Sequence, residues 1–153
     1  MPKIDREDAE VRSGAGYPGV HADPCVHRRW QNLGDVAGLT QFGVVRMVLP
    51  PGVWSSQRHW HDKEDEFVTV LEGEVVLVTD AGETLMRAGD SAGFLANDGD
   101  GHPLQNRADT DAVLLVVGSR REGDGCEYPD IDLAWRPTAG GMVHTDGTPY
   151  ERD

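Results

Sequence analysis

The chain has 153 residues, 38% of them hydrophobic, which is enough for the modest core of one ordinary domain but not for a second large one. Its 27 acidic and 14 basic residues give a formal net charge of −13, which argues against nucleic acid and anionic membrane surfaces as partners. No stretch of about 18 consecutive apolar residues occurs, so the sequence predicts no membrane-spanning helix.

The N-terminus and the two cysteines indicate the cellular compartment. Residues 1–14, MPKIDREDAEVRSG, are charged and lack the apolar core of a secretory signal. Cys25 and Cys126 show neither C-x-x-C spacing nor a secretory setting, so we interpret both as reduced thiols. We therefore expect a cytoplasmic protein.

Short apolar runs separated by turn residues favour an all-β fold over a helical bundle. The chain contains 19 glycines and 9 prolines, which suit many short strands joined by turns. Residues 1–38 are predicted to form an irregular arm that contributes edge strands at most and packs on the domain. This arm lacks the helical period that a DNA-binding helix-turn-helix requires.

The strands of the domain itself are expected within residues 39–118. Glu72 and Gly73 are predicted to form a tight hairpin. Because the strand after this hairpin is apolar on both faces, it must be covered on two sides, as in a sandwich or small barrel. Residues 119–153 are predicted to lie as a tail on the barrel surface. The expected strands are 41–49, the segment that carries His59 and His61, 67–71, 74–79, 84–87, 91–96 and 111–117.

Three potential metal ligands stand close together in residues 52–73. His59 and His61 are two residues apart, a spacing that places both imidazoles on one face of a strand, and the same parity turns Gln57 inward. A polar break at 62–65 allows Glu66 to fold back beside them. Glu64 is a rival ligand, but strand parity together with the six residues between Glu66 and Gly73 favours Glu66.

A fourth potential ligand, His102, lies in the separate stretch 89–106, GDSAGFLANDGDGHPLQN. Asn106 follows it and is interpreted as structural. The other histidines lack ligand spacing and are not expected in the site; they are His21, His27 and His144.

These two stretches resemble the paired motifs of the cupin superfamily. The second motif is looser, because Leu95 replaces the usual proline, Asn97 replaces a usual glycine, and the following loop is longer. The first motif, G-x(5 or 6)-H-x-H-x(3 or 4)-E-x6-G, is matched in full by Gly52, His59, His61, Glu66 and Gly73. The chain thus resembles small, single-domain bacterial cupins of the conserved-barrel type.

The resemblance implies a double-stranded β-helix, or jelly-roll barrel, that holds one divalent metal ion. The implied ligands are His59, His61, Glu66 and His102. Imidazole and carboxylate ligands suit iron, manganese, nickel and zinc alike, so the metal is not specified. Glu66 is also the expected catalytic residue, acting as a base if its coordination is weak.

We expect a metal-dependent enzyme of the dioxygenase, isomerase or lyase type that acts on a small oxygenated metabolite. The alternative is a metal-dependent module that binds a small molecule without turnover. A homodimer is also expected, because Trp54, Arg58 and Trp60 are predicted to form an apolar and cationic stripe on the outer surface. The alternative is that this stripe packs under the N-terminal arm.

Overall fold

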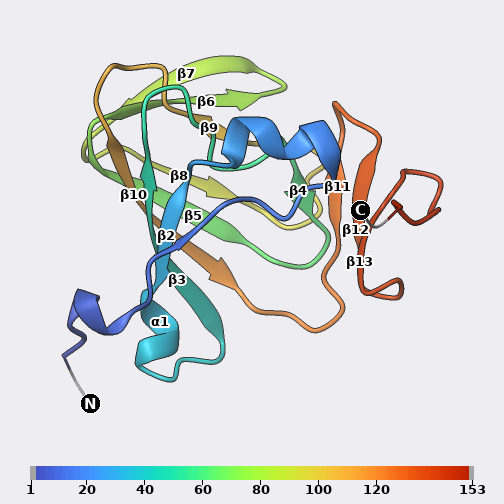
Figure 1. Ribbon diagram of the computed structural model, residues 1–153, viewed down its shortest axis with the longest axis horizontal. Coiled ribbons are helices and arrows are strands. Elements are labelled where there is room, and N and C mark those ends of the chain that lie inside the picture. Colours follow the sequence, from blue (N-terminus) through green and yellow to red (C-terminus); the bar gives the residue numbers. More distant parts are fainter. Residues whose placement is uncertain (1–2, 152–153) are drawn as a thin grey trace.

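Antiparallel strands form the framework of the computed structural model, which describes residues 3–151 (Figure 1). A six-stranded sheet has the order β1-β2-β3-β10-β5-β8, a three-stranded sheet the order β7-β6-β9, and a four-stranded sheet the order β13-β12-β11-β4. None of the helices in the described residues is long and apolar enough to cross a membrane. The short helical segments are η1 (Arg6–Asp8), η2 (Gly19–Cys25) and α1 (Leu33–Val36). The strands are β1 (Arg12–Ser13), β2 (Arg29–Asn32), β3 (Phe42–Leu49), β4 (Trp60–His61), β5 (Glu66–Glu72), β6 (Glu74–Thr79), β7 (Gly82–Arg87), β8 (Ser91–Phe94), β9 (Leu104–Gln105), β10 (Ala112–Ser119), β11 (Cys126–Tyr128), β12 (Leu133–Arg136) and β13 (Gly141–Val143).

Strand β5 carries the alternation that places Glu66 inside the barrel. Val68 and Val70 are buried on one face, whereas Phe67 and Leu71 are exposed on the other. Because side chains alternate along a strand, Glu66 shares the inward face with the two valines. The strand lies between β10 and β8, so the backbone that carries Glu66 is fixed on both sides. The main hydrophobic core packs against this face and consists of Leu49, Val53, Val68, Val70, Val75, Met86, Leu104, Ala112 and Leu114.

The predicted hairpin at Glu72 and Gly73 is wrong, because β5 pairs with β10 and β8 whereas β6 pairs with β7 and β9, so the chain passes from one sheet to another at this turn. Gly73 is needed at the turn for two reasons. Its φ of 74° lies in the left-handed region, which non-glycine residues adopt at a cost. A Cβ at this position would also lie 2.6 Å from the carbonyl oxygen of Asp111, a backbone atom that cannot move aside alone. The turn between the two sheets therefore depends on the missing side chain.

Gly73→Ala is expected to lower the free energy of unfolding by about 3 kcal/mol, combining left-handed backbone strain with overpacking. Gly52→Ala is the matched control, because Gly52 has a φ of 81° but nothing within 4 Å of an added Cβ. It should cost only the strain, about 1–2 kcal/mol. Urea denaturation of the two variants measures the difference, and equal losses would show that the contact with Asp111 is unimportant.

The N-terminal arm adds β1 and β2 at one end of the six-stranded sheet. Strand β2 pairs with β3, with Trp30 opposite Met47. Gln57, however, does not point into the barrel as parity predicted. Its side-chain amide donates a hydrogen bond of 2.7 Å to the carbonyl oxygen of His21 in η2, so Gln57 anchors the arm instead.

The C-terminal tail forms strands, which the sequence did not predict. Strand β11 pairs with β4, placing Cys126 opposite His61, and β12 and β13 follow outward at one edge of the molecule (Figure 1). A second, smaller core of Cys126, Tyr128 and Leu133 lies between this sheet and the arm, where Tyr17 packs against it. The tail is therefore continuous with the sheet that carries His61.

Arg58 does not form the predicted outer stripe with the two tryptophans. Its guanidinium donates hydrogen bonds of 2.9 Å to Asp80 and 3.0 Å to Asp130, and its side chain is 15% exposed. Trp54 and Trp60 are half-buried. The predicted stripe therefore gives no support for a homodimer, and the homodimer stays a prediction.

Candidate metal centre

His59 and His102 are paired directly through the backbone. The amide of His102 donates to the carbonyl oxygen of His59 at 2.9 Å, and the reverse bond measures 3.4 Å. The histidine segment is not the continuous strand that we expected, because β4 contains only Trp60 and His61. Upstream, the amide of Gln57 donates to the Tyr17 hydroxyl rather than to a neighbouring strand. The two sequence stretches are nevertheless brought together.

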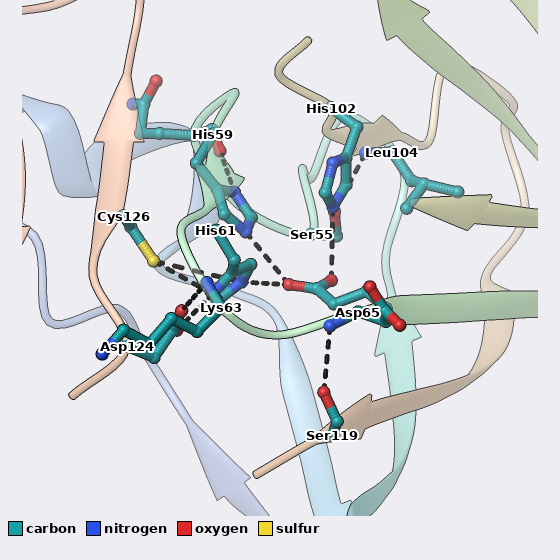
Figure 2. A network of polar contacts seen from close by, with 12 residues as sticks. Ser55, His59, His61, Lys63, Asp65, His102, Leu104, Ser119, Asp124 and Cys126 are labelled. Carbon is teal, nitrogen blue, oxygen red and sulfur yellow. Dashed lines mark hydrogen bonds and ion pairs between the residues drawn. The ribbon is translucent and has the colours of Figure 1, made fainter. Parts of the chain in front are cut away.

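Three imidazoles converge on the carboxylate of Glu66. Its Oε1 contacts Nε2 of His61 and lies 3.4 Å from Nε2 of His59, and its Oε2 lies 3.2 Å from Nε2 of His102. Figure 2 shows the rings of His59 and His61 on one side of the site and that of His102 on the other. We call these four residues the histidine cluster. Glu64 lies outside it, and its carboxylate accepts a hydrogen bond from the amide of Arg121.

The hydrogen bonds at the outer nitrogens of His59 and His61 set their tautomers. Nδ1 of His59 lies 2.9 Å from the carbonyl oxygen of Gln57, and Nδ1 of His61 lies 2.7 Å from Oδ2 of Asp124. Both partners are acceptors, so both Nδ1 atoms must carry the proton. In the neutral rings the two Nε2 lone pairs then face the Glu66 carboxylate, an arrangement that requires a cation between them. The donor set therefore fits a metal ion.

Charge interactions within the cluster shift two pKa values in opposite directions. Burial alone would raise the pKa of Glu66, but hydrogen bonds with His102, His59 and His61 outweigh it, so this pKa lies well below its usual range. Burial alone would lower the pKa of His61, but its contacts with Cys126 and Glu66 raise it to about 12. Without a metal, a proton on His61 thus takes the place of the cation.

His102 is the most deeply buried member of the cluster, with 3% of its surface exposed. Its ring stacks on Phe94 at a centroid distance of 3.6 Å, and its Nδ1 is buried without a hydrogen-bond partner. Burial outweighs the contact with Glu66 and lowers the pKa of His102, so its ring is held neutral. A neutral, immobilised imidazole has the properties of a metal ligand.

The ligand atoms of His59, His61 and Glu66 lie within 4.8 Å of one another, so these residues could hold a metal ion. A second group with the same property combines His61 with Asp124 and Cys126, whose Sγ lies 3.3 Å from Nδ1 of His61. In Figure 2 these two residues lie on the far side of His61 from His102. Sequence reasoning missed both, since they follow His61 by more than 60 positions and no motif marks them.

Asp124→Asn is expected to weaken metal binding about tenfold to a hundredfold, because an amide cannot hold the His61 tautomer as a carboxylate does. The matched control is Asp109→Asn, an exposed carboxylate outside the cluster. Titration of both variants with zinc against a competing chelator measures the affinities. Equal affinities would show that Asp124 does not position His61.

Stability should respond to pH in opposite ways with and without metal. The raised pKa of His61 gives the metal-free protein stability that is complete below its ordinary value of 6.5 and declines as pH rises towards about 12. The lowered pKa of Glu66 gives stability that is complete above its ordinary value of 4.5 and is lost as pH falls through the folded value. The metal-free protein should therefore melt highest between these two ordinary values.

Metal binding requires unprotonated imidazoles, so the stabilisation that metal adds should grow as the pH rises. Melting temperatures of metal-free and metal-loaded protein between pH 5 and 9 test both trends. A difference between the two forms that shrinks with rising pH would contradict the assignment.

A cavity of about 250 Å³ opens next to the cluster and gives small molecules access to it. Three members of the cluster face it: His59, Glu66 and His102. We call it the inner cavity. Its remaining lining comes from the barrel strands, the adjoining loops and the N-terminal arm: Tyr17, Arg28, Met47, Ser55, Ser56, Val68, Phe94, Leu104 and Val116.

The chain is similar to a known protein family and to several solved structures. Residues 45–118 match the family model described as Cupin domain. A crystal structure of a cupin-superfamily sugar phosphate isomerase from Silicibacter pomeroyi is 44% identical to the chain, covers 99% of it and 98% of its own length, and superimposes with a TM-score of 0.92. A candidate sugar phosphate isomerase from Acidithiobacillus ferrooxidans is 28% identical, over 83% of this chain and 82% of its own, with a TM-score of 0.72.

More distant structures share the fold alone. A predicted oxalate decarboxylase from Thermotoga maritima is 21% identical, over 78% of this chain and 99% of its own, with a TM-score of 0.63. No protein with a curated description matches the chain.

Proposed function

The chain belongs to the cupin superfamily, and from this membership and the histidine cluster we propose that it is a metal-dependent isomerase of a sugar phosphate. The main support for a bound metal is the orientation of His59 and His61, whose Nε2 lone pairs both point at the Glu66 carboxylate. The substrate class is supported by the Silicibacter pomeroyi protein, which shares 44% identity over almost the whole chain.

His59, His61, Glu66 and His102 are the proposed ligands of one divalent ion. Their chemistry suits iron, manganese, nickel and zinc. Such an ion, when bound, polarises a carbonyl or hydroxyl oxygen of the substrate. Glu66 fits the role of ligand better than that of a strong base, since its pKa is held well below the usual range.

Interconversion of an aldose and a ketose needs only proton movements. One proton leaves the carbon next to the carbonyl group and reaches the carbonyl carbon, while another passes from the hydroxyl oxygen to the carbonyl oxygen, so no oxidant or reductant is consumed. Glu66 is ionised at neutral pH and faces the inner cavity, so, although a weak base, its carboxylate would be placed to accept the carbon-bound proton and return it. Apolar side chains of Met47, Val68 and Val116 limit access of bulk water.

One observation supports the alternative of a binding module without turnover. Among the described residues that line the inner cavity, Glu66 is the only carboxylate, so no second carboxylic acid is in place to assist proton transfer. A module of this kind would capture the same ligand and leave it unchanged.

Incubation of metal-loaded protein with a panel of aldose and ketose phosphates, followed by phosphorus and proton NMR, distinguishes the two functions. The isomerase should convert one pair to an equilibrium mixture, and chelation should stop the conversion. A metabolite that binds tightly yet stays unchanged with iron, manganese, nickel and zinc, with and without oxygen, would establish the binding module instead.

A further inference from the structure

The inner cavity contains one positively charged side chain with no acidic partner. Arg28, from the N-terminal arm, lines the cavity together with His59 and Glu66. Within residues 3–151 no carboxylate oxygen lies within 4.0 Å of the Arg28 guanidinium, in a chain whose net charge is −13. A half-buried guanidinium without a counterion attracts an anion from solution.

Backbone carbonyl groups and aromatic rings fix the position of the Arg28 side chain and leave some of its N–H groups without a hydrogen-bond acceptor in the described part of the chain. Its Nε donates to the carbonyl oxygen of Gly14 at 2.9 Å, and its Nη1 donates to the carbonyl oxygen of Ser55 at 2.5 Å. The guanidinium also lies over the rings of Trp30, at 5.2 Å, and Tyr17, at 5.9 Å. These contacts use two of its five N–H groups, so the Nη2 side remains able to donate.

Two serine hydroxyl groups also belong to the lining of the inner cavity. Ser55 and Ser56 are 7% and 9% exposed, and both line the cavity. The Ser55 Oγ accepts a hydrogen bond from the amide of Leu104, which leaves its hydroxyl proton free to donate. Paired hydroxyl donors beside a fixed guanidinium suit a group that has several acceptor oxygens.

We propose that Arg28, assisted by Ser55 and Ser56, binds the phosphate group of the substrate in the inner cavity, while the histidine cluster faces the reacting end. The choice of phosphate over another anion rests on the proposed isomerase function. A phosphate monoester carries a charge of about −1.5 to −2 at pH 7 and has three acceptor oxygens, which match the forked donors of arginine. The N-terminal arm thus selects phosphorylated over unphosphorylated sugars.

The test uses inorganic phosphate as the probe and isothermal titration calorimetry of metal-loaded protein. Arg28→Met keeps the length of the side chain but removes its charge, and it should weaken phosphate binding about tenfold to a hundredfold, the range for hydrogen bonds to charged groups. Arg29→Met is the matched control, because Arg29 is exposed, lies outside the inner cavity and pairs with Asp111 at 3.7 Å. Its phosphate affinity should equal that of the wild type.

Three results would overturn the proposal. Equal phosphate affinity in wild type and Arg28→Met would show that phosphate binds elsewhere, for instance on the metal. Absence of phosphate binding to wild type would remove the site altogether. Binding of acetate through Arg28 in place of phosphate would assign the site to carboxylates.

Because Arg28 also holds the arm, a melting curve of each variant accompanies the titration. If Arg28→Met unfolds, Ser56→Ala and Arg28→Lys replace it, and both should bind phosphate more weakly; unchanged affinity in both overturns the proposal. Failure of the isomerase function has a different signature, since phosphate binding would still depend on Arg28 although no sugar phosphate is converted. Conversely, isomerisation with the same KM in Arg28→Met would retain the function and reject the phosphate site.

Discussion

Replacing His61 with alanine should remove most of the bound metal from the purified protein. The change deletes one ligand. It also removes the ring that lies between two carboxylates, with Nε2 in contact with Glu66 and Nδ1 at 2.7 Å from Oδ2 of Asp124. The loss of affinity should therefore exceed the roughly tenfold to hundredfold effect of removing a group that only orients a ligand. Elemental analysis of protein purified without added chelator measures the metal content per chain.

His27→Ala is the control, because His27 is exposed and lies outside the histidine cluster. This variant should retain about one metal ion per chain, as the wild type should. The ligand assignment fails if His61→Ala and wild type carry the same amount of metal.

Glu66→Gln should lower kcat by about a hundredfold or more, the usual contribution of a positioned acid or base. Glutamine keeps the size of the side chain and one of its oxygens but removes the negative charge towards which the three Nε2 atoms are directed. The variant should lose rate by more than it loses substrate affinity, as expected for a group that acts on the transition state. Turnover and ligand affinity are measured on the same sugar phosphate.

The matched control for this change is Glu72→Gln, at the opposite end of β5, where the side chain is exposed. It makes the same chemical change on the same strand without touching the cluster and should leave kcat unaltered. A Glu66→Gln protein that binds more weakly but turns over at the wild-type rate would exclude Glu66 from the chemistry.

The sequence predicted the all-β cupin fold because the decisive signals were local. Strand parity alone could not separate Glu66 from Glu64, which are two residues apart, but the six residues between Glu66 and Gly73 favoured Glu66. In the structure β5 begins at Glu66, and Glu64 precedes it and bonds to the amide of Arg121. The turn at Gly73 was predicted from a glycine whose φ of 74° few other residues adopt, but the turn joins two sheets and not the paired strands of a hairpin. Asn106 was correctly interpreted as structural, since its amide donates to the carbonyl oxygens of Leu49 and Thr110.

The errors arose where distant segments determine the local conformation. Parity failed at Gln57 because the backbone there bonds to the Tyr17 hydroxyl and follows no strand. Asp124 and Cys126 reach His61 through the pairing of β11 with β4, a contact between segments that share no motif. Arg28 likewise enters the inner cavity from the arm, which sequence reasoning treated as mere packing.

The position of the metal is the most direct test of this account. Crystals of metal-loaded protein, with diffraction data collected at the absorption edge of the bound element, locate the ion by its anomalous signal. We predict one ion per chain, bound by the Nε2 atoms of His59, His61 and His102 and by the carboxylate of Glu66. An ion held instead by Asp124 and Cys126, or no ion in the histidine cluster of fully loaded protein, would contradict it.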